Sequence, residues 1–396
     1  MQSSQTTFLV LGGGVAAMNA AQSIRGADPD GRVVMVTNES FLPYYRPMLT
    51  KQLAKGAEPA KFLVHDESWY ADKKIEVVLG SEAVSLDTSA KSVTLSDKSQ
   101  WSYSKCVLAV GAECFLPPLP GISKPGVYAL RKIDDFQRLR AVMEGAKTAI
   151  VVGGGALGLE AADALCAAGI SVTVFENGGR LMPRQLDGDA SELLSQKLES
   201  SGIHVRYEAA SEEVVGDPKA EGIKLKSGET LLADLILFST GAAANVNLAK
   251  SAGLAVERGI VVNEYLETDA ADVYACGDCA QYHGVSYKLM SEAAAMGKLA
   301  GSNAAGGKGV YEFPAPPLYF SGAGTSLFAV GANGTAQGKT YEVDKTGAAD
   351  GSYRALYYED GALAGAILLG DTKASGKLEK AVQGHWSRAE VEAALR

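Results

Sequence analysis

Gly12-Gly13-Gly14-Val15-Ala16-Ala17 is the stretch that decides the fold, because it follows the apolar run at residues 8–11 and precedes an alanine-rich segment. The arrangement returns after 153 − 12 = 141 residues, where Gly153-Gly154-Gly155-Ala156-Leu157-Gly158 follows the apolar residues 149–152. Glycines after a strand let the backbone turn sharply against a pyrophosphate, and the next helix directs its N–H groups and dipole at the phosphates. A simple turn is the alternative for each cluster, but two such units predict two bound dinucleotides.

The second strand of each unit is expected to end near an acidic side chain that accepts a hydrogen bond from a ribose hydroxyl. In the second unit Glu176 directly follows the strand at residues 172–175. Its carboxylate would repel a 2′-phosphate, so it favours NADH over NADPH. In the first unit the strand covers residues 32–36, and the nearest acid is Glu39, two positions beyond Thr37, which aligns with Glu176.

Composition describes an ordinary globular chain of 396 residues, with 47% hydrophobic and 21% charged residues. The net charge of −9 and the absence of a basic run argue against nucleic-acid binding. No apolar stretch is long enough to span a bilayer, so no membrane association is expected. The N-terminus enters the first strand almost directly, without a secretory signal, which predicts a cytoplasmic protein.

Cysteine and histidine usage points away from a metal site. Cys276-Gly277-Asp278-Cys279 has the C-x-x-C spacing of redox and metal sites, but no second pair completes such a site. The other cysteines are Cys106, Cys114 and Cys166, and the histidines are His65, His204, His283 and His385. Because their spacing matches no ligand pattern, we predict no bound metal.

Residues 268–278 read as a short buried strand that ends in Gly-Asp. With this motif and the strand-turn junctions at residues 108–112 and 238–242, the sequence resembles the FAD- and NAD-dependent pyridine nucleotide oxidoreductases over roughly residues 5–310. The resemblance implies an α/β fold with two Rossmann-like dinucleotide-binding domains, the NADH domain being inserted in the FAD domain. It also implies a small α+β C-terminal domain.

The resemblance and the proline-rich breakers divide the chain into three predicted domains. Residues 1–118 and 244–312 form the FAD-binding domain, residues 119–243 the NADH-binding domain, and residues 313–396 a C-terminal interface domain. In the last of these we expect strands at residues 326–330, 340–343, 353–358 and 362–368 and a helix at 387–395. In the family this domain serves dimerisation or partner docking, so a homodimer is one expectation.

Residues 41–51 contain no cysteine, although the disulfide reductases of the family carry a redox-active cysteine pair in this region. A thiol therefore cannot take electrons from a flavin at this point. The pattern from Tyr44 to Lys51 resembles instead rubredoxin reductases, oxygenase-coupled ferredoxin reductases and the flavin portion of assimilatory-type nitrite reductases. In those reductases the residue that matches Lys51 lies near flavin N5, paired with a glutamate that Glu160 matches, and both are implied to be catalytic. Arg46 is implied to contact the flavin or the pyrophosphate.

The resemblance also implies the remaining cofactor contacts. The implied FAD-binding residues are Gly12, Gly14, Ala17, Glu39, Arg46, Lys51, Ala109, Gly111, Gly277, Asp278, Met290 and Phe320. The implied NAD-binding residues are Gly153, Gly155, Leu157, Gly158, Glu160, Glu176 and Gly241. The chain departs from the family after Gly241, where the common Arg-Pro-Asn is replaced by Ala242-Ala243-Ala244-Asn245.

These features together predict an FAD-dependent reductase that takes a hydride from NADH at flavin N5. It is expected to pass single electrons to a small iron protein, most simply rubredoxin, with ferredoxin as another carrier. Two alternatives stay open within the enzymes, an NADH oxidase and the flavin subunit of a nitrite reductase. A third alternative is a non-catalytic, redox-responsive binding protein, as in relatives of apoptosis-inducing factor.

Overall fold

The computed structural model describes residues 6–312, 315–347 and 351–396. Its described residues divide into two compact units. The first unit holds residues 6–46, 58–113 and 242–312, and the second holds residues 47–57, 114–241 and 315–396. Residues 47–57, which the sequence assigns to the FAD domain, therefore group with the second unit. The division into three domains stays a prediction, and its boundary at residue 313 and the breaker Pro314 lie outside the described residues.

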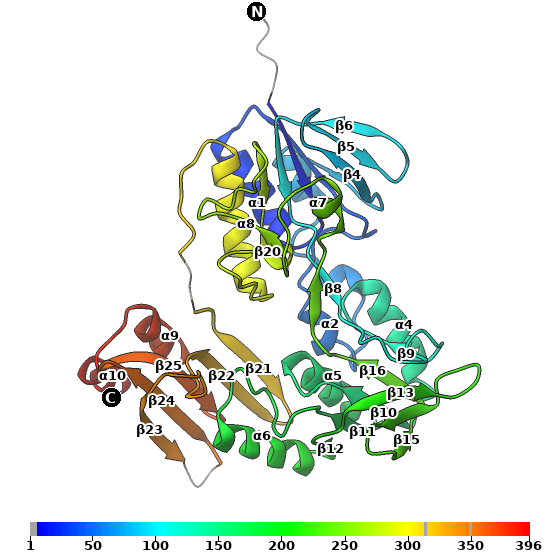
Figure 1. Ribbon diagram of the computed structural model, residues 1–396, viewed down its shortest axis with the longest axis vertical. Helices are drawn as coiled ribbons and strands as arrows, with labels where there is room; N and C mark the ends of the chain where they lie inside the picture. Colours follow the sequence, from blue (N-terminus) through cyan, green and yellow to red (C-terminus); the bar gives the residue numbers. More distant parts are fainter. Residues whose placement is uncertain (1–5, 313–314, 348–350) are drawn as a thin grey trace, which may run out of the picture. The chain divides into compact units, whose positions relative to one another are not determined.

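A five-stranded parallel sheet forms the centre of the first unit, in the order β19-β7-β1-β2-β3. Its strands are β1 (Thr7–Leu11), β2 (Arg32–Val36), β3 (Ile75–Val78), β7 (Lys105–Leu108) and β19 (Val273–Ala275). The inner strands are nearly continuous apolar runs, as expected for parallel strands that are buried on both faces. Helices α1 (Val15–Ala27) and α8 (Met290–Ala304) lie side by side (Figure 1).

Two glycines on α8 set how closely it approaches α1. A Cβ atom on Gly297 would lie 2.3 Å from the carbonyl oxygen of Ala16, and one on Gly301 would lie 2.3 Å from that of Ala20. Real Cβ atoms do not approach other atoms so closely, so only glycine permits this contact. The contact holds the start of α1, and with it the first glycine loop, against the helix that follows the Gly-Asp motif.

Smaller elements complete the first unit. An antiparallel sheet is made of β4 (Ala83–Asp87), β5 (Ser92–Leu95) and β6 (Gln100–Ser102). The others are α3 (Glu67–Asp72), α7 (Asn247–Ser251), β8 (Ala112–Cys114), β17 (Ala242–Ala244), β18 (Ile260–Val261), β20 (Ala280–Gln281), and the short 3-10 helices Pro59–Phe62 and Gly277–Cys279.

The second unit repeats the architecture with a parallel sheet in the order β12-β11-β10-β16-β9. Its strands are β9 (Val127–Tyr128), β10 (Thr148–Val152), β11 (Ser171–Phe175), β12 (Ile203–Arg206) and β16 (Leu235–Phe238). Its helices are α2 (Met48–Lys51), α4 (Ile133–Met143), α5 (Ala156–Ala167) and α6 (Gly188–Ser200). A small antiparallel sheet is added by β13 (Ser211–Val215), β14 (Gly222–Leu225) and β15 (Thr230–Leu232).

The C-terminal part of the second unit is an antiparallel sheet in the order β21-β22-β25-β24-β23. Its strands are β21 (Leu318–Gly322), β22 (Thr325–Gly331), β23 (Glu342–Gly347), β24 (Tyr353–Glu359) and β25 (Ala362–Leu369). Helices α9 (Ser375–Gln383) and α10 (Arg388–Leu395) pack on one of its faces around a separate apolar core (Figure 1). The predicted fold class is thus confirmed: two parallel Rossmann-like sheets and a C-terminal α+β domain.

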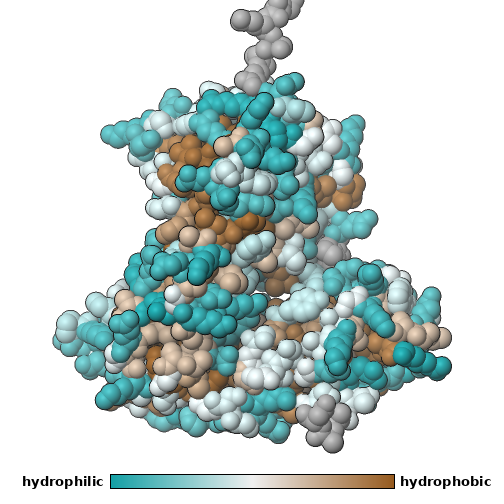
Figure 2. All heavy atoms as spheres, turned by 180° about the vertical axis from the view of Figure 1, so that it is seen from behind, coloured by the Kyte–Doolittle hydropathy of each residue, from teal (hydrophilic) through white to brown (hydrophobic). Residues whose placement is uncertain are grey.

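The expected elements of this C-terminal sheet are confirmed in part. Strands β22, β24 and β25 and helix α10 lie where they were predicted, whereas β23 begins at Glu342 rather than at residue 340. Strand β21 and helix α9 were not predicted, and α9 contains Gly376, a poor helix former. Hydrophilic side chains are spread over the face of the molecule in Figure 2. Across the described ranges, every helix is too short or too polar to cross a membrane.

Candidate functional site: two glycine loops and their acidic partners

The first glycine loop closes on the ends of β7 and β2, the two strands that flank β1. Gly12 has a φ of +141°, and a Cβ atom there would lie 2.0 Å from the carbonyl oxygen of Ala109. A Cβ atom on Gly13 would meet the Thr37 hydroxyl at 2.3 Å, whereas one on Gly14 would meet nothing within 4 Å. The loop is therefore tight on its inner side and open at the N-terminus of α1, which is the shape that a pyrophosphate requires.

The second glycine loop repeats this construction. Gly153 has a φ of +117°, and its Cβ atom would lie 2.4 Å from the carbonyl oxygen of Ser239, whereas Gly155 again faces open space. Gly158 packs α5 against the loop, because a Cβ atom there would lie 2.1 Å from the carbonyl oxygen of Gly153. Leu157, beside it, is 53% exposed. Both loops thus have the shape that fits a dinucleotide, with a tight contact at the first glycine and open space at the third.

Glu176 is held at the edge of the second loop by backbone amides. The Gly154 N–H donates to Glu176 Oε2 at 2.9 Å, and the Gly178 N–H donates to Oε1 at 2.7 Å. Each carboxylate oxygen can accept a further hydrogen bond. The half-buried side chain is therefore preorganised at the place where the sequence predicts a ribose hydroxyl.

The corresponding edge of the first unit carries a polar cluster of Glu39, Tyr44 and Arg46. Tyr44 donates to Glu39 Oε2 at 2.6 Å, and Arg46 donates to Glu39 Oε1 at 2.5 Å and to the Tyr44 hydroxyl at 2.9 Å. Burial acts to lower the pKa of Arg46, but its interactions with Tyr44, Glu39 and Asp278, including the hydrogen bond to Glu39, outweigh burial and raise that pKa. Arg46 therefore stays cationic and lies within electrostatic reach of two predicted FAD residues.

The other predicted FAD residues of the first unit surround the N-termini of α1 and α8. Gly277 has a φ of +71°, and its Cβ atom would lie 2.8 Å from that of Ala16 in the first turn of α1. Gly111, with a φ of +68°, faces open space. Ala17 and Ala109 are buried, Asp278 is half-buried, and Met290 is 39% exposed at the first position of α8. The residues present fit FAD, and their individual contacts with it stay predictions.

Glu160 on α5 and Thr50 on α2 meet within the second unit. The Thr50 hydroxyl donates to Glu160 Oε2 at 2.7 Å, whereas no ion pair within 4 Å joins Lys51 to Glu160 among the described residues. Burial raises the pKa of Glu160, while the Thr50 hydrogen bond and the charge of Lys51 act to lower it. Lys51 is exposed, so its ammonium acts on Glu160 through space, and the predicted roles of both residues stay predictions.

Two more predicted residues lie in the second unit. Phe320, on β21, is 2% exposed and packs beside Gly322 and α5. Gly241 is exposed, has a φ of +106° and accepts a backbone hydrogen bond from Phe115 through its carbonyl. Their predicted contacts with FAD and NAD stay predictions.

The cysteine pair of the Gly-Asp motif is buried and reduced. Cys279 Sγ lies 3.3 Å from the carbonyl oxygen of Cys276 and 3.4 Å from that of Leu108. Burial raises the pKa of Cys279 to about 11, so the thiol stays protonated at neutral pH. Over the residues that the structure describes, the histidine, cysteine and acidic side chains form no group that could hold a metal ion.

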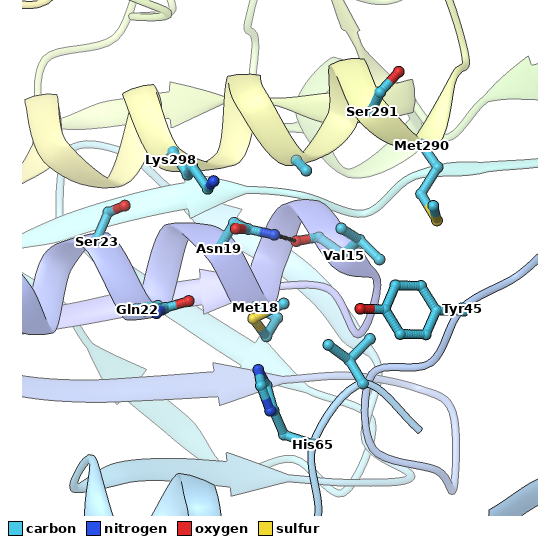
Figure 3. Close-up of a pocket in the computed structure, with 12 residues that line it drawn as sticks. Val15, Met18, Asn19, Gln22, Ser23, Tyr45, His65, Met290, Ser291 and Lys298 are labelled. Carbon is cyan, nitrogen blue, oxygen red and sulfur yellow. Dashed lines mark hydrogen bonds between the residues drawn. The ribbon is translucent and has the colours of Figure 1, made fainter. Parts of the chain in front are cut away.

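A groove of about 530 Å³ runs between α1 and α8 in the first unit. Figure 3 shows Ser291 and Lys298 on α8, Asn19 and Gln22 on α1, and the His65 ring pointing toward α1. Tyr45 and Met290 line it near the N-termini of the two helices, and both side chains are exposed. No carboxylate stands among the described residues that line this groove, although the chain as a whole carries a net charge of −9.

This groove and the hydrogen-bond partners of the predicted acidic residues were not predicted from the sequence. Tyr44 and Thr50 both lie in the segment at residues 41–51, so the pattern that singled out Arg46 and Lys51 contained their signal. The groove left no such signal, because its lining comes from four separate stretches of the chain.

Comparison with known proteins yields two family matches. The sequence pattern described as pyridine nucleotide-disulphide oxidoreductase matches residues 6–297, and that of the rubredoxin NAD+ reductase C-terminal domain matches residues 314–385. The chain is 32% identical to a nitrite reductase [NAD(P)H] of Bacillus subtilis, over 95% of this chain and 47% of that protein. It is also 32% identical to a rubredoxin-NAD(+) reductase of Alcanivorax borkumensis, over 94% of this chain and 97% of that protein.

Solved structures agree with these matches. The NADH:rubredoxin oxidoreductase of Clostridium acetobutylicum superposes with a TM-score of 0.81 at 28% identity, over 97% of this chain and 96% of that chain. The chain spans about half the length of the first curated relatives that it matches, 47% and 45% of them.

Proposed function

The chain belongs to the pyridine nucleotide-disulphide oxidoreductase family, and from this membership we propose that it is an NADH-dependent flavin reductase. FAD as prosthetic group and NADH as substrate are typical of the family. We propose that single electrons leave for a small iron protein, with rubredoxin as the first candidate and ferredoxin as the second. A cytoplasmic location belongs to the same proposal.

One observation carries this proposal: the same glycine loop is built twice, each time with open space at a helix N-terminus. Gly14 and Gly155 face that space in the first and second loop. Glu176 beside the second loop favours NADH, because its fixed carboxylate would repel a 2′-phosphate. FAD, when bound, supplies the centre that accepts a hydride and releases electrons one at a time.

The residues of the second unit supply charge and orientation for hydride transfer. The Lys51 ammonium would stabilise negative charge as it develops on the acceptor. Glu160, held by the Thr50 hydroxyl, would border the nicotinamide and keep the local charge balanced against Lys51. Residues 41–51 hold no cysteine, which supports an outlet to an external carrier rather than to a protein disulfide.

The groove between α1 and α8 supports a carrier with an acidic face. Lys298 and His65 line it, and no carboxylate stands among its described lining residues, although the chain has a net charge of −9. Exposed Tyr45 and Met290 beside the groove are residue types enriched in protein interfaces. The match of residues 314–385 to the rubredoxin reductase C-terminal domain supports rubredoxin as the first candidate.

An anaerobic experiment tests the proposal. The FAD-loaded protein is mixed with NADH and oxidised rubredoxin, and the bleaching of flavin and rubredoxin is followed together. We expect rapid flavin bleaching and then catalytic rubredoxin bleaching. Flavin bleaching with rubredoxin left oxidised moves the search to ferredoxin and oxygen, and no flavin bleaching by NADH contradicts the whole proposal.

A second candidate function is the flavin part of a nitrite-reducing system. It is favoured by the match of 95% of this chain to 47% of the Bacillus subtilis nitrite reductase. An NADH oxidase would instead turn over on oxygen as fast as on any carrier. A redox-responsive binding protein would be reoxidised slowly by every carrier and would dimerise with NADH.

A further inference from the structure

The loop at residues 177–187 joins the predicted ribose-binding residue Glu176 to helix α6. At its start the Gly178 N–H donates to the Glu176 carboxylate at 2.7 Å. In its middle the Met182 N–H donates to the carbonyl of Gly154, the second residue of the glycine loop, at 3.2 Å. Met182 is 1% exposed and has a φ of +46°, a left-handed backbone conformation that residues other than glycine rarely adopt. The loop is thus part of the wall of the NADH site.

The end of this loop is anchored to the C-terminal sheet through Asp187, which is 6% exposed. Its Oδ1 accepts from the Ala190 N–H at 2.9 Å and so caps α6. Its Oδ2 accepts from the hydroxyls of Tyr353 at 2.5 Å and Tyr357 at 2.6 Å, both on β24. Lys345 on β23 lies 3.2 Å from the same oxygen. One buried carboxylate therefore joins the nucleotide-binding sheet's helix to two strands of the C-terminal sheet.

A second anchor acts on the same loop. Asn333, which follows β22 and is 8% exposed, lies with its Nδ2 atom 3.2 Å from the carbonyl oxygens of both Pro183 and Leu186. Hydrogen bonds from the C-terminal domain thus fix residues 183–187 in place. The preceding residue, Met182, donates the hydrogen bond to the glycine loop.

We propose that Asp187 is a positioning residue for the NADH site, through which the C-terminal domain contributes to the affinity for NADH. This inference rests on the proposed function. Fixing residues 183–187 holds Met182 against Gly154 and Gly178 against Glu176. Without the anchor the loop keeps its sequence and its glycines but loses the support that aims the Glu176 carboxylate at the ribose.

The test removes two hydroxyl groups and nothing else. In the double variant Tyr353→Phe/Tyr357→Phe both rings stay in the sheet, but the Asp187 carboxylate loses two donors. The matched control is Tyr358→Phe on the same strand, because the buried Tyr358 hydroxyl has no hydrogen-bond partner among the described residues and packs toward α9 and α10. Wild type and both variants are prepared as full-length, FAD-loaded protein.

The readouts are the affinities for NAD+ and NADP+, the oxidised cofactors, which probe the NADH site without reacting and are measured by calorimetric titration. Flavin content and the flavin-reduction rate at saturating NADH are measured beside them. We expect the double variant to bind NAD+ about tenfold more weakly, with a smaller preference over NADP+. Flavin content and the saturated rate should stay at the wild-type level, and the Tyr358→Phe control should bind like wild type.

Three outcomes would overturn the inference. Unchanged NAD+ affinity in the double variant would make the anchor purely structural. An equal loss in the Tyr358→Phe control would assign the effect to general loosening of the sheet. Wild-type protein that binds FAD but no NAD+ would instead refute the proposed function, and with it the site that Asp187 is inferred to support.

Discussion

Replacing Gly301 by alanine tests the contact that brings α1 and α8 together. The new methyl group would lie 2.3 Å from the carbonyl oxygen of Ala20 and 2.8 Å from its Cα atom, both of which belong to backbone. An ordinary contact needs at least 3.4 Å, so the helices must separate by about 1 Å. Since α1 begins at the first glycine loop, its N-terminus moves with it.

Two opposing effects set the change in the free energy of unfolding that Gly301→Ala should cause. Overpacking a close helix contact destabilises by about 1–3 kcal/mol, whereas alanine in a helix stabilises by up to about 1 kcal/mol relative to glycine. With the full offset we therefore expect a net loss of up to about 2 kcal/mol. We also expect a lower flavin content, because the displaced helix dipole points less well at the phosphates.

Unfolding is followed by flavin release and by circular dichroism in parallel samples. The matched control is Gly376→Ala in α9, where a Cβ atom would meet nothing within 4 Å and φ is not left-handed. We expect that control to be as stable as wild type or more so, by up to about 1 kcal/mol. A Gly301→Ala protein that unfolds like this control and retains full flavin would refute the steric argument.

Four further predictions concern single side chains. Lys51→Ala should slow flavin reduction by NADH at least about tenfold or lower the flavin potential, because the developing anion loses its counter-charge; stopped-flow kinetics and redox titration that match wild type would contradict this. Glu176→Ala should weaken NADH binding roughly tenfold and narrow the gap to NADPH, and an unchanged ratio of Michaelis constants would remove Glu176 from the ribose site. Thr50→Val should raise the pKa of Glu160 further, because the Thr50 hydrogen bond lowers it, so the pH profile of flavin reduction should move to higher pH. An unchanged pH profile would show that this hydrogen bond does not influence flavin reduction. For Asp187, burial raises the pKa, but hydrogen bonds outweigh it and hold the pKa below its usual 3.8, so its stabilisation is complete above that pH and lost as the pH falls through the lowered pKa. The free energy of unfolding, measured in urea, should therefore be higher for wild type than for Asp187→Asn at neutral pH, and this difference should shrink in acid.

The two nucleotide-binding halves could be predicted from sequence because their signals are local. A strand, a glycine turn and a helix occupy about twenty consecutive residues around Gly12 and again around Gly153, and the structure contains both. The strands of the C-terminal sheet were predicted where apolar residues run together, as at Ala362–Leu369. Helix α9 was missed because its apolar side chains are few and Gly376, a poor helix former, lies in its first turn.

The long-range contacts could not be predicted in this way. Thr50 and Glu160 are 110 residues apart, and Asp187 and Tyr353 are 166 residues apart. Their pairing depends on how separate elements pack, and the local sequence around each residue does not indicate its partner. The resemblance named Lys51 as the partner of Glu160, but the hydroxyl one position earlier makes the hydrogen bond, because the short helix α2 turns Thr50 toward α5.

The pair of glycine loops has a consequence for how such a chain can change over time. In both loops the first glycine is excluded from substitution by a carbonyl oxygen 2.0–2.4 Å away, and the third glycine is free of protein atoms. The loops differ beside the middle glycine, because the Thr37 side chain faces Gly13, whereas Leu181 and the Glu176 carboxylate face Gly154. One construction thus serves both halves, and they diverge at the side chains beside that middle glycine. Evolution toward a different nucleotide in either half is therefore open at Thr37 and Glu176 and closed at Gly12 and Gly153.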